Sequence, residues 1–143
     1  MLVSLKWLAD YVALPLPPKA LAERLTLAGA KVGRIIERGT DWDAISVGQV
    51  VTVHPHPNAD RLLLVTVDLA AAERPTVVCG APNVAAGQKV AFAQPGARLI
   101  DGHSGELAEL KPARIRGVDS AGMVCSEKEL GLSEDHQGIL VLT

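Results

Sequence analysis

Two stretches decide the fold class of this sequence, ISVGQVVTV at residues 45–53 and LLLVTVDL at residues 62–69. Both are rich in β-branched residues and alternate in the manner of half-buried strands. Pro55 and Pro57 follow the first stretch, and we expect them to end it because proline cannot donate to a strand ladder. The two stretches therefore predict consecutive strands joined by a short proline-containing loop.

The remainder of the sequence continues this β pattern. Further short runs of strand-forming residues lie at 76–79, 89–93, 109–115, 123–125 and 139–142. Turn residues such as Pro95-Gly96 separate them, and many short strands at close spacing are typical of a closed or partly closed barrel. Ser126 and Glu129 have the spacing of a capping box, and Gly131 is expected to end a helix of about one turn there.

The first forty residues have a helical pattern instead. Ser4 can cap a short helix, Pro18 fits the first turn of a second helix, and Gly29 stands where a left-handed residue is expected to end it. Residues 32–36 follow as a short strand-like run. Such a segment buries little by itself, so we expect it to dock on other sequence.

Composition excludes several classes of protein. Apolar residues make up 48% of the 143 residues and charged residues 21%, which is typical of a globular chain and not of a disordered or collagen-like one. Cys79 and Cys125 have no CxxC or Cys/His spacing and are predicted to be reduced and buried. No run approaches 18 apolar residues and no signal-peptide pattern is present, so we expect a cytoplasmic protein that does not enter a membrane.

The charge balance and the aromatic content give no indication of nucleic-acid binding. The formal net charge is −2, and residues 44–143 hold eight basic and eleven acidic residues. Few aromatic residues are available on which bases could stack. The sequence also contains no GxSxG, Walker or HExxH motif, so we expect no catalytic residue in it.

The loop at residues 54–62 concentrates polar side chains and allows three interpretations. His54, His56 and Asp60 could ligate a metal, although no third nitrogen or thiolate follows at metal-binding spacing. The loop could be a structural turn in which Asn58 or Asp60 bonds its own backbone and Arg61 pairs with a carboxylate. It could also be a binding loop in which Asn58 and Arg61 donate hydrogen bonds to a ligand.

The run KPARIRG at residues 111–117 carries a possible phosphate-binding face. On a strand, Arg114 and Arg116 would share one face, with Lys111 just before them. Cations on one face suit phosphate contacts, which position a protein without reading sequence. An exposed strand face that carries arginines to discourage edge pairing is an equally good interpretation.

Longer stretches carry a family resemblance. HPNADRL at 56–62, VCGAPNV at 78–84, AQPGA at 93–97 and the run from Ile115 to Leu132 resemble the tRNA-binding, oligonucleotide-fold (OB-fold) domain of several tRNA-associated proteins. VSLKWL at 3–8 and LAERLTLAG at 21–29 are similar to the start of the β subunit of bacterial phenylalanine–tRNA ligases. The resemblance covers essentially the whole chain.

This resemblance implies a mainly β fold, with a Greek-key OB-fold barrel at residues 40–143. Before it, residues 1–39 would form a small α/β segment of two short helices and a strand, as part of an incomplete first module. The chain would be the N-terminal part of a longer β subunit in an α2β2 ligase, with the α subunit and the rest of the β subunit as partners. The full enzyme would use ATP, Mg²⁺, phenylalanine and its tRNA, whereas this segment would be non-catalytic and hold no cofactor.

The resemblance also associates the loop around Asn58 and the stretch around Ser126 with the RNA surface, and the basic run at 111–117 is added from spacing. The predicted RNA-binding residues are Asn58, Asp60, Arg61, Lys111, Arg114, Arg116, Ser126 and Lys128. Because the β region is acidic and poor in aromatic residues, we expect a weak auxiliary contact with tRNA. The alternatives are a free-standing tRNA-binding or chaperone-like module and a purely structural interaction domain.

Overall fold

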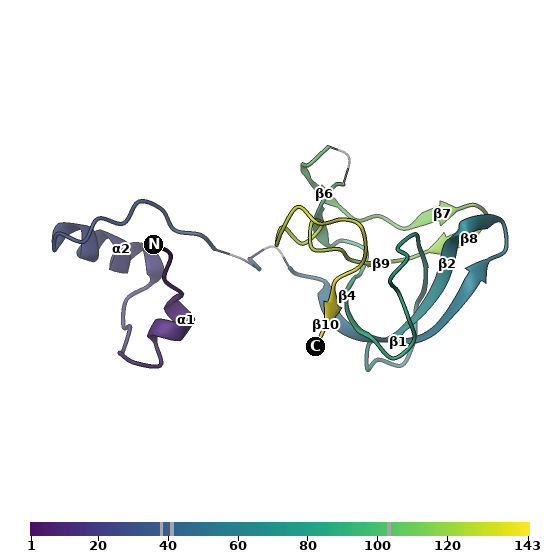
Figure 1. Ribbon diagram of the computed structural model, residues 1–143, viewed down its shortest axis with the longest axis horizontal. Coiled ribbons are helices and arrows are strands. Elements are labelled where there is room, and N and C mark those ends of the chain that lie inside the picture. Colours follow the sequence, from purple (N-terminus) through teal and green to yellow (C-terminus); the bar gives the residue numbers. More distant parts are fainter. Residues whose placement is uncertain (38, 41, 103) are drawn as a thin grey trace. The chain divides into compact units, whose positions relative to one another are not determined.

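The structure is a computed structural model that describes residues 1–37, 39–40, 42–102 and 104–143. The chain divides into two compact units, Met1–Glu37 and Arg38–Thr143 (Figure 1). The domain boundary expected between residues 39 and 40 stays a prediction. None of the helices in the described residues combines the length and the apolar character that a membrane crossing requires.

The N-terminal unit contains two helices, α1 (Leu5–Leu8) and α2 (Pro18–Leu27). Both predicted helix starts are confirmed: the Ser4 hydroxyl accepts a hydrogen bond from the Trp7 N–H at 3.3 Å, and Pro18 opens α2. Gly29 follows α2 with φ of +94°, the left-handed conformation expected of a residue that ends a helix.

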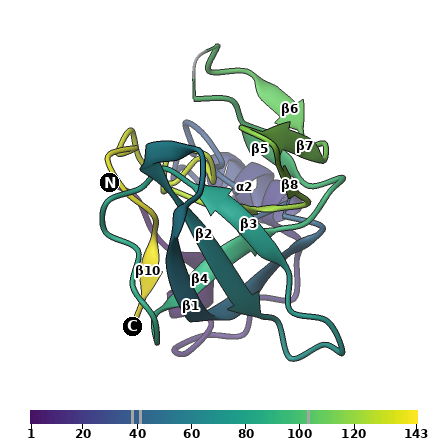
Figure 2. The same cartoon turned by 90° about the vertical axis from the view of Figure 1, so that its right-hand side faces the viewer.

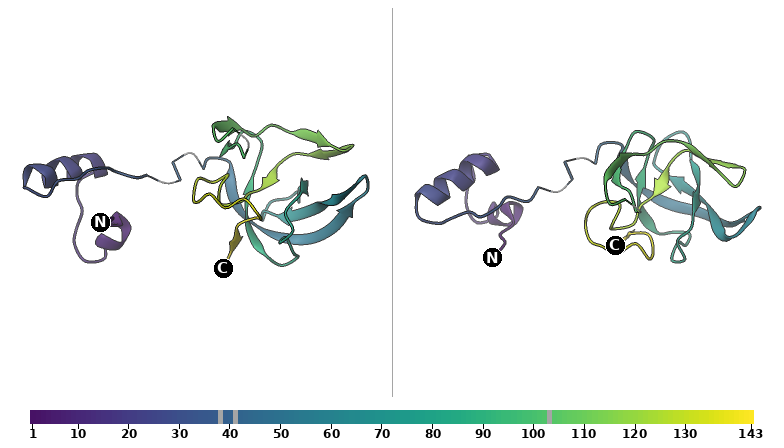
Figure 3. Two further views of the ribbon diagram at one scale, coloured as in Figure 1. Left: turned by 45° about the horizontal axis from the view of Figure 1, so that its top comes forward. Right: turned by 90° about the horizontal axis from the view of Figure 1, so that it is seen from above.

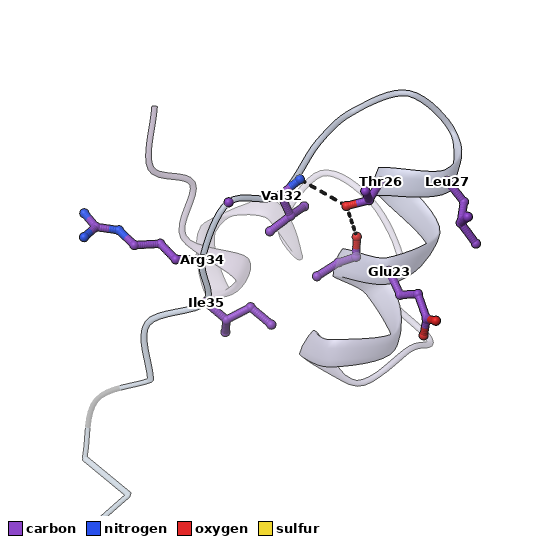
Figure 4. Close-up of a pocket in the computed structure, with 8 residues that line it drawn as sticks. Glu23, Thr26, Leu27, Val32, Arg34 and Ile35 are labelled. Carbon is purple, nitrogen blue, oxygen red and sulfur yellow. Dashed lines mark hydrogen bonds between the residues drawn. The ribbon is translucent and has the colours of Figure 1, made fainter.

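The prediction of a strand at residues 32–36 is wrong. No strand forms there, because no neighbouring extended segment among the described residues of this unit offers a ladder. Instead, the Val32 N–H donates to Thr26 Oγ1 at 3.1 Å, and that hydroxyl donates to the Ala22 carbonyl at 2.8 Å. The segment after α2 is therefore tied to the helix by a side chain (Figure 4).

Helix α2 and the following segment line a shallow hollow of about 440 Å³, to which Val32, Arg34 and Ile35 contribute (Figure 4). Neither helix contains a buried residue. Leu27 remains 84% exposed and Trp7 57% exposed. The described part of this unit thus has no apolar core of its own.

The second unit is built from short antiparallel strands. They are β1 (Ile45–His56), β2 (Ala59–Asp68), β3 (Thr76–Cys79), β4 (Lys89–Ala93), β5 (Arg98–Ile100), β6 (Leu107–Glu109), β7 (Ala113–Ile115), β8 (Val118–Ser120), β9 (Met123–Val124) and β10 (Val141–Leu142). The largest sheet has the order β10-β4-β1-β2-β3 (Figure 2). Strand β9 also pairs with β4. The β5–β6 and β7–β8 pairs form separate two-stranded ribbons. The fold is mainly β with two short N-terminal helices.

Three details of the strand prediction are corrected. Strand β1 runs through Pro55 to His56, because the last part of β1 pairs only with β2 and an unpaired edge tolerates proline. The strand predicted at 109–115 is interrupted at residues 110–112, so its ends belong to β6 and β7, which pair with different partners. Strands β5 and β8 carry no strong sequence signal and were not predicted.

The helix predicted after Ser126 is a turn, although its capping bonds are present. Glu129 Oε2 accepts from the Ser126 N–H at 2.6 Å and from the Ser126 hydroxyl at 2.8 Å. Gly131 adopts φ of +67°, and the Leu132 N–H already donates to the Glu127 carbonyl at 2.9 Å. The chain therefore reverses at Gly131, as the sequence predicts, and the residues before it form a single turn.

The core of the β unit lies between the sheet strands and the segments that follow β4. Its fully buried large side chains are Phe92, Val50, Val65, Val67, Val77, Val90 and Cys125. A second cluster forms around Ala93, Leu99 and Leu130. The Ser120 hydroxyl accepts from the Val78 N–H at 3.1 Å and donates to the Gly122 carbonyl at 3.2 Å, so a side chain links β3 with β8.

Both cysteines are free and buried, as the sequence predicted. Burial raises the pKa of the Cys125 thiol from 9.0 to about 12, and the nearby Glu129 carboxylate adds to the shift. Burial likewise raises the pKa of Cys79. The fold therefore favours the protonated thiols.

This shift predicts an alkaline loss of stability. The pKa of Cys125 is higher in the folded chain than in the unfolded one. The stabilisation that the protonated thiol adds to the free energy of unfolding is therefore fully present below about pH 9 and is lost as the pH rises towards 12. We expect urea unfolding to show a free energy of unfolding that falls by up to about 1.4 kcal/mol per pH unit for this thiol above pH 9. Cys125→Ala should flatten the dependence, and an unchanged slope in that variant would contradict the assignment.

Candidate nucleic-acid interface

The turn between β1 and β2 presents Asn58 at the free end of the longest strands. The Asn58 backbone N–H donates to His56 Nδ1 at 3.0 Å, which closes the turn locally. His56 is 5% exposed, whereas Asn58 is exposed. This part of the structure matches the structural-turn interpretation of the loop. The side chain that bonds to the loop backbone is, however, His56, and not Asn58 or Asp60 as expected.

The turn between β7 and β8 consists of Arg116 and Gly117. Both residues have positive φ, +49° and +90°, and Ile115 pairs with Val118 directly across the turn. This is the two-residue hairpin turn that suits the twist of paired strands. The expectation that Arg114 and Arg116 share one strand face is therefore wrong, because the chain has left the strand at Arg116.

These two turns are bonded to each other. Asn58 Nδ2 donates to the Arg116 carbonyl at 3.0 Å, and the ring of His56 bonds through Nε2 to the Ile115 carbonyl at 3.2 Å. Figures 1 and 3 show the light-green β7–β8 hairpin beside the free end of the blue-teal β1–β2 ribbon. We call His56, Asn58, Arg114 and Arg116 the hairpin-tip cluster.

Arg114 is partly engaged within its own hairpin. Its Nε donates to the Gly117 carbonyl at 3.3 Å and lies 3.6 Å from Asp119 Oδ1. The Arg114 side chain is nevertheless 73% exposed, and that of Asp119 86%. An exposed pair of this kind contributes little to stability, so the arginine can exchange its partner for a phosphate at small cost.

The other basic and acidic candidates on this side flank the cluster along the chain. Lys111 lies in the segment between β6 and β7 and is exposed. Asp60 and Arg61 are both exposed. Because they are adjacent residues of β2, their side chains point to opposite faces of the strand.

Ser126 and Lys128 belong to a different part of the unit. Ser126 is buried and bonds to Glu129, as described above. Lys128 Nζ donates to the Gly102 carbonyl at 3.5 Å, which places it against the β5–β6 loop. The eight predicted residues therefore form two groups, and three members of the hairpin-tip cluster, Asn58, Arg114 and Arg116, belong to the group that lacks Ser126 and Lys128.

The metal interpretation of the loop receives no support from the described residues. They bring together no group of three His, Cys, Asp or Glu side chains that could hold a metal ion. Both ring nitrogens of His56 are already bonded to protein groups. His56 is thus a structural link between two turns, a role that the sequence analysis missed. The available signal was a histidine between Pro55 and Pro57, two residues before Asn58, but its carbonyl partner lies 59 positions along the chain.

Comparison with known proteins gives a consistent result. A family model described as "Putative tRNA binding domain" matches residues 45–143. The phenylalanine–tRNA ligase β subunit of Dehalococcoides mccartyi is 54% identical over 142 residues, which are 99% of this chain and 17% of that protein. The β subunit of Salinibacter ruber is 47% identical over 145 residues, 98% of this chain and 18% of its own length.

A third β subunit, from Thermosynechococcus vestitus, is 46% identical over 145 residues, covering 100% of this chain and 17% of that protein. The chain is homologous to the N-terminal part of these β subunits, which contains the tRNA-binding domain, and it spans only about 17% of their length. Among solved structures, an RNA ligase R4a mutant from Naegleria gruberi aligns with a TM-score of 0.45 at 16% identity, covering 66% of this chain and 31% of that chain.

Proposed function

The chain belongs to the family of tRNA-binding domains, and on that premise we propose that its β unit makes a weak, largely shape-based contact with tRNA within a phenylalanine–tRNA ligase. The observation that carries this proposal is the hairpin-tip cluster, in which hydrogen bonds hold two arginines at one exposed end of the unit. Arginine side chains at such a rim suit phosphate oxygens, which position a protein on RNA.

We further propose that the β unit is a Greek-key OB-fold barrel. The antiparallel order of the main sheet and the Ser120 link between β3 and β8 support this reading. In that arrangement the buried Ser120 hydroxyl joins β3, the last strand of the main sheet, to β8 of the separate β7–β8 ribbon. The hairpin tips would then form part of the barrel rim.

The individual residues differ in what they can offer. Arg61, Lys111 and the two arginines of the cluster can donate to phosphates, and Lys128 can do so from the β5–β6 side. Asp60 can only accept, and a ribose 2′-hydroxyl is a suitable donor to it. We assign Ser126 an indirect part, because its hydroxyl is buried and bonded to Glu129 in the turn that carries Lys128.

The whole protein would be an α2β2 ligase in the cytoplasm that attaches phenylalanine to its tRNA with ATP and Mg²⁺. We propose that this segment itself carries out no chemical step of that reaction. We place aminoacylation on the α subunit. The contribution of this segment is then an auxiliary tRNA contact.

The proposal predicts a specific change in salt-dependent tRNA binding. The double variant Arg114→Ala with Arg116→Ala should weaken binding of a fluorescein-labelled tRNA(Phe) transcript and lower the slope of log Kd against log salt by up to about two. Anisotropy titrations of the 143-residue chain at several salt concentrations measure both quantities. Binding should be weak and should fall steeply as salt rises.

Arg74→Ala is the control, because it removes one positive charge from an exposed residue that pairs with Asp68, at the end of β2 away from Asn58. It should leave the Kd within about twofold of the parent chain, since a charge far from the RNA is largely screened. An unchanged slope in the double arginine variant, or tight binding that salt does not disturb, would contradict the proposal.

A purely structural role is the second candidate, and the Arg114–Asp119 contact favours it. In that case the arginine serves only to hold its own hairpin. Crosslinking of the assembled ligase to tRNA distinguishes the two functions. Adducts on residues 54–62 or 111–128 support RNA contact, and their absence supports the structural role.

A further inference from the structure

Asn58 donates two hydrogen bonds to protein groups. Its backbone N–H donates to His56 Nδ1 at 3.0 Å, and its side-chain Nδ2 donates to the Arg116 carbonyl at 3.0 Å. A Cβ atom at Gly117 would lie 3.5 Å from that same Nδ2, so the side chain rests against both residues of the β7–β8 turn. This geometry is that of a brace between two turns.

The bonds of His56 require one form of its ring. Nδ1 accepts from the Asn58 N–H and therefore carries no proton. Nε2 faces the Ile115 carbonyl at 3.2 Å, which can only accept, so Nε2 must carry the proton. The ring is thus neutral with its hydrogen on Nε2, and it is 5% exposed.

The turn that these bonds support is intrinsically unfavourable at one position. Arg116 has φ of +49°, a left-handed conformation that a residue with a side chain rarely adopts. Such conformations persist where surrounding contacts hold them. The Asn58 bond to the Arg116 carbonyl and the His56 bond to the preceding carbonyl are two such contacts.

We infer that His56 and Asn58 are positioning residues, which hold the Arg116–Gly117 turn so that the Arg116 side chain meets a tRNA phosphate, and that they do not themselves bind RNA. This inference rests on the proposed tRNA contact and reassigns Asn58 from a ligand of RNA to a support for Arg116. Without these hydrogen bonds the turn samples several conformations. Ordering Arg116 when tRNA binds then costs conformational entropy and weakens the affinity.

A double-mutant cycle between Asn58→Ala and Arg116→Ala tests the inference with the labelled tRNA(Phe) transcript and the 143-residue chain. In the parent background, Asn58→Ala should raise the Kd about two- to tenfold, the effect of one lost hydrogen bond. In the Arg116→Ala background the same change should raise the Kd by less than about 1.5-fold, because the supported side chain is already absent.

The outcomes separate this inference from the proposed function. If Arg116→Ala weakens binding and Asn58→Ala has the same effect in both backgrounds, Asn58 contacts RNA directly or acts elsewhere, and only the inference is overturned. If neither variant changes the Kd, the proposed interface fails as well. Asn58 is exposed, so thermal melts of both variants should stay close to the parent and exclude misfolding as the cause.

Two further measurements address His56, whose removal from a buried site can disturb folding. The ¹⁵N shifts of its imidazole should report a neutral ring protonated at Nε2, and a ring protonated at Nδ1 would overturn the inference. His56→Gln can keep a donor near the Ile115 carbonyl, whereas His56→Ala keeps neither bond. The glutamine variant should therefore retain more tRNA affinity than the alanine variant, and equal losses would contradict the positioning role.

Discussion

Phe92→Ala should destabilise the β unit by about 3–5 kcal/mol, the usual cost of removing a buried aromatic side chain. Phe92 is 1% exposed and is the largest fully buried side chain of the core. It lies on β4, opposite Ser46 of β1 on one side and Val124 of β9 on the other. The cavity left by the ring would therefore open at the centre of the sheet, where the surrounding strands can collapse little.

Urea unfolding followed by far-ultraviolet circular dichroism measures this loss. Phe92→Leu is the matched control, because it keeps an apolar side chain and should cost less than half as much. Since a domain of this size has a total stability of about 5–15 kcal/mol, this loss should remove a large share of the stability and lower the urea midpoint clearly. A loss below 1 kcal/mol would place Phe92 outside the packed core and contradict the structure.

Gly122→Ala should cost about 2–5 kcal/mol, for two reasons that act together. Gly122 has φ of +154°, which side-chain-bearing residues rarely adopt. An added Cβ would also meet the Phe92 ring, lying 2.9 Å from Cε1, and the Ala93 carbonyl at 3.0 Å. The glycine lets the chain between β8 and β9 pass directly over the core aromatic.

Gly102→Ala is the control for this variant. Its added Cβ would meet nothing within 4 Å, and the stability should stay within about 0.5 kcal/mol of the parent. Combining Gly122→Ala with Phe92→Leu tests the mechanism, because a smaller side chain at 92 should relieve part of the clash. Strict additivity of the two losses would show that backbone strain alone explains the effect.

Local chemistry was enough to predict many of the elements. Ser4 and Pro18 begin helices because their capping and backbone properties act over a few residues, and the strands at 76–79 and 89–93 have the predicted bounds. The capping bonds of Ser126 and Glu129 are also local. The stretch behind them ends at Gly131 as predicted, but it forms a turn and not a helix.

Predictions that needed a partner were less successful. The run at 32–36 has strand propensity but meets no neighbouring strand among the described residues, so it bonds to Thr26 instead. Pro55 stays within β1 because that part of the strand has one unpaired edge. Residues 109–115 were predicted as one strand and form two, because their partners lie in different ribbons.

The sequence by itself determined the β class of residues 45–143, the two short helices before them, and the presence of polar loops rich in Asn, Asp and Arg. It also determined the family, since motif residues and their order are properties of the chain. Only the tertiary structure decided that Asn58 meets Arg116 and that His56 links two turns. These contacts join residues 58 and 59 positions apart, and no local pattern encodes which loop ends come together when a sheet folds.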